Sequence, residues 1–322
     1  MSEEELAADV READAASGRA RADRGAAPAS ERSRVRRGML FTVVGGALWG
    51  LNGTAAKFLM DTYAIDPLWF ACLRELTACW LFLGMAWMRN REKLVGAVTS
   101  PKALVSILGV SLSAILFSQV AYLEAIDWTN SATATVLQSL SMVGVLCYVC
   151  VKMRRLPKRR EALGVVMALV GTYLVATGGN PGSLSLPLGG LAWGGLCAAA
   201  AACLAILPAK QMKAWGNFVV NGLAFLMSGT ILAVVYQPWA HMPQLDALAV
   251  VLLAACVVLG TFGAYGLYLE GVKEAGSLRA SLLSTVEPLT ATVATVLLLG
   301  TPFSPAELVG FALILGMVYL TA

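Results

Sequence analysis

The chain has 322 residues, of which 58% are hydrophobic and 14% are charged, with a formal net charge of +4 and a mean hydropathy of +0.71. Soluble domains contain roughly 25% charged residues, so this composition argues against a water-soluble enzyme or a nucleic-acid-binding domain. Residues 1–38 carry 16 of the 44 charged side chains, and the rest of the chain is apolar enough to place most of its surface in lipid. The sequence therefore indicates a polytopic membrane protein.

Residues 1–38 are rich in Ala, Glu, Asp, Arg and Ser, with eight basic and eight acidic side chains. This composition is typical of a disordered tail, which we expect on the cytoplasmic side. The segment does not resemble a secretory signal, because acidic residues precede the first apolar stretch and that stretch is long enough to span a membrane.

Ten apolar stretches follow the tail. A membrane-spanning helix needs about 20 predominantly apolar residues, with a working range of about 17–25. Prolines such as Pro67, Pro187 and Pro305 mark the short connections between the stretches. We therefore expect an all-α polytopic membrane protein with ten transmembrane helices. In chain order the stretches are 39–60, 67–88, 103–125, 131–151, 162–178, 188–207, 217–237, 247–271, 280–299 and 306–322.

The basic residues predict the orientation of these helices. With the tail inside, 22 of the 24 Lys and Arg residues fall in the tail or in connections on its side, and the five opposite connections contain none. Basic residues mark the cytoplasmic side of membrane proteins. We expect a multi-pass protein of the inner or plasma membrane with both termini in the cytoplasm. The bias also supports ten helices, because one missed helix would invert every later connection.

An internal repeat divides the apolar region. Residues 45–50 read Gly-Gly-Ala-Leu-Trp-Gly and residues 189–194 read Gly-Gly-Leu-Ala-Trp-Gly. The triplet Tyr-Leu-Glu also occurs twice, at 122–124 and 268–270. This pattern predicts a five-helix unit that occurs twice. Because five is odd, the second unit would enter the membrane from the opposite side, an inverted arrangement that underlies alternating access in many carriers. The expected repeats are 39–178 and 179–322.

These motifs resemble the EamA-type branch of the drug/metabolite transporter superfamily. The resemblance rests on the Gly-Gly-x-x-Trp-Gly openings, on Arg74, and above all on residues 281–288, Ser-Leu-Leu-Ser-Thr-Val-Glu-Pro, and it covers residues 39–322. It implies a carrier of small metabolites whose central cavity is lined mainly by helices one, three, four, six, eight and nine. The chain departs from the family pattern at Met142, where many relatives have proline. Ser141 stands opposite Glu287, so the first repeat lacks the residues for a symmetric kink or a paired carboxylate.

Glu287 is the leading candidate for a transport residue. It lies near the middle of the ninth stretch, where an ionised carboxylate costs about 2.5–3.5 kcal/mol or more and normally faces a cavity or a partner. Pro288 removes a backbone donor beside it and favours a kink that exposes carbonyl groups. We expect a role in proton coupling or cation binding. The alternative is a neutral carboxyl that serves as a structural hydrogen-bond partner.

Two basic residues within the helices have alternative interpretations. Arg74 could bind a substrate carboxylate through two hydrogen bonds, although an ion pair with an acid on another helix, such as Glu124, is the favoured explanation. Glu75 follows Arg74 but diverges from it around the helix. Lys57 lies one helical turn before Asp61, which favours an interfacial pair over a substrate contact.

The remaining candidates are neutral. Asn52 is expected either in the cavity or in a hydrogen bond between helices. Trp49 and Trp193 occupy equivalent repeat positions below the headgroup level, where they could close over a ligand or simply pack. The small-residue pairs around them should allow the first and sixth helices to approach closely. The other candidates from the expected cavity helices are Gln119, Gln138, Ser141, Tyr122, Tyr265 and Tyr268.

These observations favour a secondary carrier that moves small metabolites such as amino acids, amines or carboxylates by alternating access, coupled to protons or to exchange. The chain contains no Walker-type ATP site. The alternatives are a non-transporting structural or sensory membrane protein and a membrane-embedded enzyme. The enzyme is disfavoured because His241 is the only histidine and the acids are scattered. We expect no cofactor or metal. The expected partners are a small metabolite and the lipid bilayer, with a second copy of the chain as a further candidate and no nucleic acid.

Overall fold

The computed structural model describes residues 29–180 and 182–321, and these residues form helices and connections without any strand. Eight helical spans within them are long and apolar enough to cross a membrane, and two shorter apolar helices follow near the C-terminus. The elements are α2 (Ala29–Tyr63), α3 (Pro67–Thr99), α4 (Pro101–Val110), η1 (Ser111–Leu116), α5 (Phe117–Trp128), α6 (Ser131–Gln138), α7 (Ser141–Lys152), α8 (Arg159–Thr177), α9 (Leu188–Ile206), α10 (Ala209–Trp215), α11 (Asn217–Tyr236), η2 (Pro238–Ala240), α12 (Ala247–Ala255), η3 (Cys256–Gly263), α13 (Ala264–Ala275), α14 (Ser277–Leu283), α15 (Val286–Leu299) and α16 (Pro305–Thr321).

The first helix begins earlier than the apolar pattern predicts. Most of the expected tail, residues 1–28, lies outside the described residues, but residues 29–38 already belong to α2. These ten residues extend α2 before the apolar stretch begins. Within them, Arg37 forms an ion pair with Glu274 of α13. The ion pair therefore fixes this charged part of α2 against α13.

Side-chain caps start several helices at the end of the molecule opposite to the beginning of α2. Asp66 accepts hydrogen bonds from the backbone N–H groups of Leu68 and Trp69, at 2.8 and 3.3 Å. Asp246 caps α12 in the same way, and the bond from the Ala249 N–H lowers the pKa of that carboxyl. Because the first N–H groups of a helix have no partner within the helix, these carboxylates fix where each helix begins.

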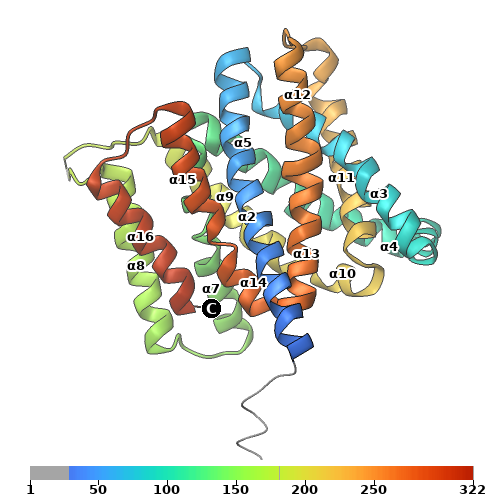
Figure 1. The fold of residues 1–322 in the computed structure, drawn as a ribbon, viewed down its shortest axis with the longest axis horizontal. Helices are drawn as coiled ribbons and strands as arrows, with labels where there is room; N and C mark the ends of the chain where they lie inside the picture. The colour runs from blue at the N-terminus through green and yellow to red at the C-terminus, as the bar shows by residue number, and fades with distance from the viewer. Residues whose placement is uncertain (1–28, 181, 322) are drawn as a thin grey trace, which may run out of the picture.

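The helices pack in equivalent pairs (Figure 1). α3 packs on α11, and α8 packs on α16. α2 packs on α13 and α15, while α9 packs on α5 and α7. When each helix of the first half is exchanged for its counterpart in the second half, the same set of pairs results. The repeated sequence motifs therefore have a counterpart in the packing.

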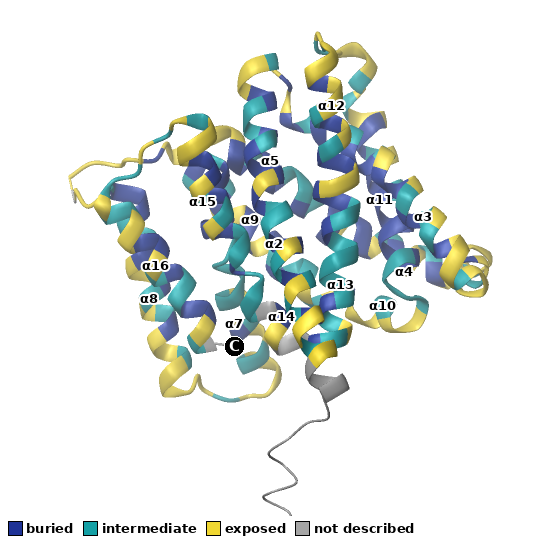
Figure 2. Cartoon of the chain, in the orientation of Figure 1, coloured by how far each residue is buried: buried dark blue, intermediate teal, exposed yellow. Residues whose placement is uncertain are grey.

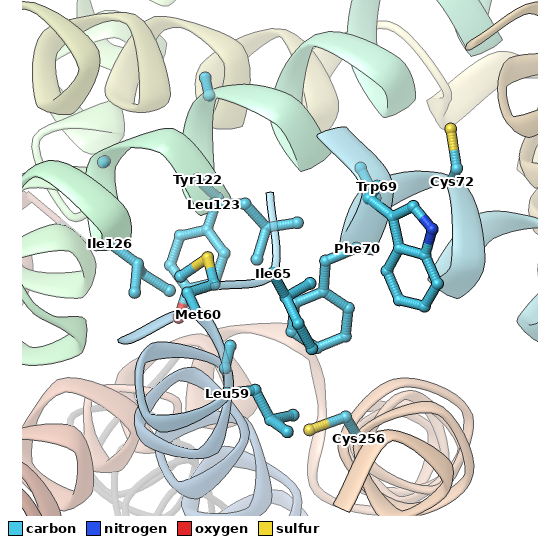
Figure 3. Packing of buried hydrophobic residues seen from close by; sticks show 14 of the residues in the cluster. Leu59, Met60, Ile65, Trp69, Phe70, Cys72, Tyr122, Leu123, Ile126 and Cys256 are labelled. Atoms are coloured by element: carbon cyan, nitrogen blue, oxygen red, sulfur yellow. The ribbon is translucent and has the colours of Figure 1, made fainter. Parts of the chain in front are cut away.

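The largest buried cluster joins α2, α3, α5, α9 and η3 (Figure 3). Leu59, Ile65, Phe70 and Leu123 are almost fully buried within it. Ile65 lies in the short connection between α2 and α3, so even this turn contributes an apolar side chain to the core. Burial of this cluster holds the first three helical spans together beside the central region.

Exposed residues line the outer sides of the helices (Figure 2). Many of them are large hydrophobic side chains, among them Trp80 at 65%, Val235 at 77% and Leu297 at 75% exposed. A soluble monomer rarely exposes such extended apolar surface. These side chains are positioned to contact lipid, which agrees with an integral membrane protein.

The basic segments lie at one end of the molecule. α2 begins and α16 ends at this end, and the connection between α7 and α8 and the short helix α10 also lie there (Figure 1). That connection includes Arg154, Arg155 and Lys158, and α10 includes Lys210 and Lys213. We call this side of the molecule the basic end.

The pairing of α8 with α16 depends on two glycines that leave no room for a side chain. A Cβ atom added to Gly171 would lie 2.8 Å from the carbonyl oxygen of Gly310. We predict that Gly171→Ala lowers the melting temperature of the purified protein, since overpacking costs about 1–3 kcal/mol. Gly109→Ala is the matched control, because no atom lies within 4 Å of its added Cβ. A Gly171→Ala variant as stable as Gly109→Ala would contradict this packing.

Candidate functional site

Two spans are interrupted at equivalent positions near the middle of the molecule. α6 gives way to α7 after Gln138, and α14 gives way to α15 after Leu283. In the first break the N–H of Met142 donates to the Ser139 carbonyl at 3.2 Å, and in the second the N–H of Glu287 donates to the Ser284 carbonyl at 2.9 Å.

The kink is therefore symmetric although only the second span contains a proline. Pro288 lacks the N–H that would otherwise bond to the Ser284 carbonyl. In the first span the Ser139 hydroxyl donates to the Thr135 carbonyl at 3.1 Å, and such bonds of serine to the preceding turn bend helices. The break in the first half thus occurs beside a serine, and the break in the second half occurs beside a proline.

Two π-helical segments also occupy equivalent positions. η1 separates α4 from α5, and η3 separates α12 from α13. Such segments insert an extra residue into a helix, and they occur frequently at functional sites. Gln119 and Tyr122 follow η1, and Tyr265 and Tyr268 follow η3. Hydropathy alone did not predict these segments, because the residues in them remain apolar.

A central cavity of about 180 Å³ lies between these interrupted helices. It brings together seven of the residues predicted from the sequence, which come from six different spans. Its walls are aromatic on one side, where Trp49 packs edge-on against Tyr265 with ring centroids 5.3 Å apart. The lining residues are Trp49, Arg74, Ser118, Gln119, Tyr122, Gln138, Leu204, Tyr265 and Glu287.

A second cavity of about 170 Å³ adjoins the first. Gln138 and Glu287 line both cavities, so these two side chains stand at the junction. Ser141 and Thr285 line only the second cavity. Because α14 leads from the basic end to α15, the second cavity lies on that side of Glu287. The two cavities therefore meet at Gln138 and Glu287, between the helix breaks and the aromatic walls.

Glu287 and Arg74 face the same cavity without pairing. Among the described residues, the ion pairs of the structure involve neither side chain. Arg74 is only 7% exposed, and its Nε and Nη1 atoms have no hydrogen-bond partner. The expected ion pair between Arg74 and Glu124 does not form. Glu75 instead packs with its Cβ toward Gly229 of α11, which leaves the Arg74 guanidinium directed at the cavity.

Three predicted residues, Asn52, Trp193 and Tyr268, line neither of these two cavities. Asn52 packs against Gly260 of η3, and its Oδ1 atom is buried without a hydrogen-bond partner. Trp193 packs at the edge of the largest apolar cluster. Lys57 follows the favoured interpretation, because its ammonium group pairs with Asp61 at 2.9 Å and donates to the Asp127 carbonyl at 2.8 Å.

Three buried hydroxyl groups tie together the helices beside the cavity. The hydroxyl oxygens of Thr54 and Ser131 are 2.8 Å apart, and those of Ser131 and Thr295 are 3.0 Å apart. These residues belong to α2, α6 and α15, and Thr54 also donates to the Gly50 carbonyl at 3.2 Å. Thr54 and Thr295 gave no signal in the sequence, because threonine is common in apolar helices.

Comparison with known proteins gives consistent matches over the whole helical region. The model of the EamA-like transporter family matches residues 36–177 and 188–322. YicL, an uncharacterized inner membrane transporter of Salmonella typhimurium, is 31% identical over 285 residues, which cover 88% of this chain and 95% of the relative. YwfM, an uncharacterized transporter of Bacillus subtilis, is 25% identical over 293 residues, which cover 88% and 93%.

One crystal structure has the same fold, with a TM-score of 0.59 at 16% identity, over 90% of this chain and 96% of that chain. The family and the names of the relatives point to a membrane transporter rather than an enzyme.

The position of Glu287 depends on the close approach of α2 at Gly50. A Cβ atom added there would lie 2.5 Å from the Glu287 carbonyl oxygen and 2.8 Å from the Ala291 nitrogen. We predict that Gly50→Ala displaces α15 and lowers the melting temperature by several degrees, because both clashing atoms belong to the backbone.

Gly46→Ala in the same helix provides the control for this prediction. Its added Cβ would lie no closer than 3.5 Å to α15, so alanine should leave the stability unchanged or raise it slightly. Equal melting temperatures for the two variants would contradict the tight contact at Gly50.

Proposed function

Because the chain belongs to the EamA-like transporter family, we propose that this membrane transporter is a secondary active carrier. It moves small polar metabolites across the cell membrane by alternating access. The observation that carries the proposal is the central cavity, in which unpaired cationic and anionic side chains face the same space among neutral polar and aromatic groups.

Amino acids are the favoured substrate class, ahead of amines and simple carboxylates. Arg74 offers guanidinium N–H groups without partners to a substrate carboxylate, and Glu287 offers a carboxylate to a substrate ammonium group. Binding a zwitterion would supply both missing partners at once. A charge buried without a partner is costly, so the empty site favours a ligand that carries both signs.

Glu287 is also the proposed coupling residue. It stands where the two cavities meet, and the second cavity lies on the side of Glu287 that faces the basic end. A proton that reaches Glu287 would compete with the substrate ammonium group for the same carboxylate. This competition would link substrate release to proton uptake, which is the requirement for proton-coupled transport or exchange.

Ten membrane crossings and two inverted repeats complete the proposal. Two apolar helices, Val286–Leu299 and Pro305–Leu320, are too short to cross a membrane by length alone. α14 precedes the first of them and lengthens that span. The equivalent packing pairs support two halves related by a two-fold axis, and rocking of the halves would open the cavity to either side. With the basic end in the cytoplasm, both termini are cytoplasmic.

Fusions with alkaline phosphatase, which is active only outside the cytoplasm, test this topology. We predict that fusions after Gly178 and after Phe303 are active, whereas fusions after Met153 and after Ala322 are inactive. The fusion after Phe303 is active only if α14 and α15 together cross the membrane, and an inactive fusion after Ala322 then requires α16 to cross back. An inactive fusion after Phe303 would contradict the ten-crossing arrangement.

Transport is tested with purified protein in liposomes. A thermal-shift screen of amino acids, amines and carboxylates selects the ligand, and its flux is then measured with and without a pH gradient. We predict that a pH gradient drives accumulation of the ligand in the unmodified protein. Glu287→Gln should abolish this accumulation, because the neutral amide cannot exchange a proton. Glu92→Gln, an exposed site on α3, is the matched control.

Arg74→Gln tests recognition of the substrate carboxylate separately. Hydrogen bonds to charged groups contribute about 1.5–3 kcal/mol, so the apparent affinity for a carboxylate-bearing ligand should fall about tenfold or more. The apparent affinity for an amine that lacks the carboxylate should fall much less.

Accumulation of the ligand by Glu287→Gln at the normal rate and with the normal pH dependence would refute the coupling role.

A further inference from the structure

A lateral groove of about 610 Å³ lies near the basic end, separate from the central cavity. Residues of α2, α3, α11, η3 and α13 form its walls. Its deeper part is apolar, with Met85, Phe218 and Phe262, and its mouth carries Arg89 and Lys273. The proposed transport mechanism does not use this groove.

An aromatic wall separates the groove from the central cavity. Phe82 packs against Phe262 with ring centroids 5.2 Å apart, and against Tyr265 with centroids 5.8 Å apart. Phe262 faces the groove, and Tyr265 lines the central cavity. The groove is therefore a distinct space rather than the entrance of the transport site.

The charges at the mouth favour an anion. Arg89 donates to Glu270 at 3.4 Å, and Lys273 donates to the other oxygen of Glu270 at 3.2 Å. One carboxylate thus serves two cations. The side chains of Arg89 and Lys273 remain 56% and 74% exposed, so both keep donors for another partner. Arg37 and Glu274 nearby pair with each other, so they do not change the net charge at the mouth of the groove.

The depth of the mouth matches the level of lipid headgroups. α3 leaves the helical conformation at Asn90, which lines the groove, with φ −142° and ψ 41°. One turn earlier, Trp87 is 51% exposed, and the Arg91 guanidinium lies over its ring at 4.4 Å. Exposed tryptophan paired with arginine is typical of the boundary between hydrocarbon and headgroups. Arg89 therefore lies where a lipid phosphate would be.

We propose that this groove binds an anionic glycerophospholipid of the leaflet at the basic end. The phosphate contacts Arg89 and Lys273, and one acyl chain lies along Met85, Phe218 and Phe262. Gly266 makes room for the chain, because no atom lies within 4 Å of a Cβ added to this residue. Basic pockets between helices on the cytoplasmic side are known to hold acidic headgroups. The lipid would contact α3 and α13 together, and α13 carries Tyr265 of the central cavity.

Native mass spectrometry of the full chain in mild detergent tests the proposal. Phosphatidylglycerol and phosphatidylcholine with identical acyl chains are titrated separately. We expect phosphatidylglycerol to bind more tightly, and Arg89→Gln/Lys273→Gln to weaken its binding about fivefold for each cation removed. Lys210→Gln/Lys213→Gln removes the same charge from exposed residues of α10 and should leave binding unchanged.

A second variant tests the apolar part without changing any charge. Gly266→Phe should fill the groove and weaken phosphatidylglycerol binding, whereas Gly109→Phe, on α4 and equally free of close neighbours, should not. Inorganic phosphate alone should raise the melting temperature little, since it has no acyl chain. Equal binding of both lipids, insensitivity to Gly266→Phe, or a protein dimer that occupies the groove without lipid would overturn the proposal.

Discussion

Three hydroxyl groups connect α2, α6 and α15 beside the central cavity. Thr54, Ser131 and Thr295 are almost fully buried and form a continuous chain of hydrogen bonds. In a membrane interior an unmade hydrogen bond is costly, so this chain holds the three helices in one register. Gly50 lies one turn from Thr54 and lets the backbone of α2 touch that of α15 at Glu287. The position of Glu287 therefore follows from this junction.

The departures from regular α-helix lie where the cavity is. Two breaks free backbone groups at the level of Gln138 and Glu287, and two π-helical segments precede the polar and aromatic residues of the cavity walls. Irregular backbone within a membrane is tolerated where it is buried in protein or lines a polar space. The helices that face lipid, such as α8 and α16, have no such interruption. The interrupted spans therefore line the cavity, whereas spans such as α8 and α16 contact lipid as regular helices.

Sequence reasoning found the cavity residues with mixed success. Several charged or polar groups deep in apolar stretches line the cavity, but depth alone did not identify them, because Glu75 and Asn52 are also deep and lie elsewhere. Glu287, Arg74, Gln119 and Gln138 all line the central cavity. Symmetry was a weaker guide: Trp49 reaches the cavity, but its counterpart Trp193 packs in the apolar core. Equivalent backbones do not place equivalent side chains when the facing residues differ.

The sequence by itself determined an all-helical membrane protein, the concentration of positive charge in a few connections, and the twofold recurrence of one unit. These properties follow from composition and spacing, which hydropathy and charge report directly. Only the tertiary structure decided that Arg74 remains unpaired, that Asn52 lies outside the cavity and that the first span kinks without a proline, beside a serine that bonds to the preceding turn. Each of these depends on which helix lies opposite, and that choice is made by packing between residues far apart in the chain.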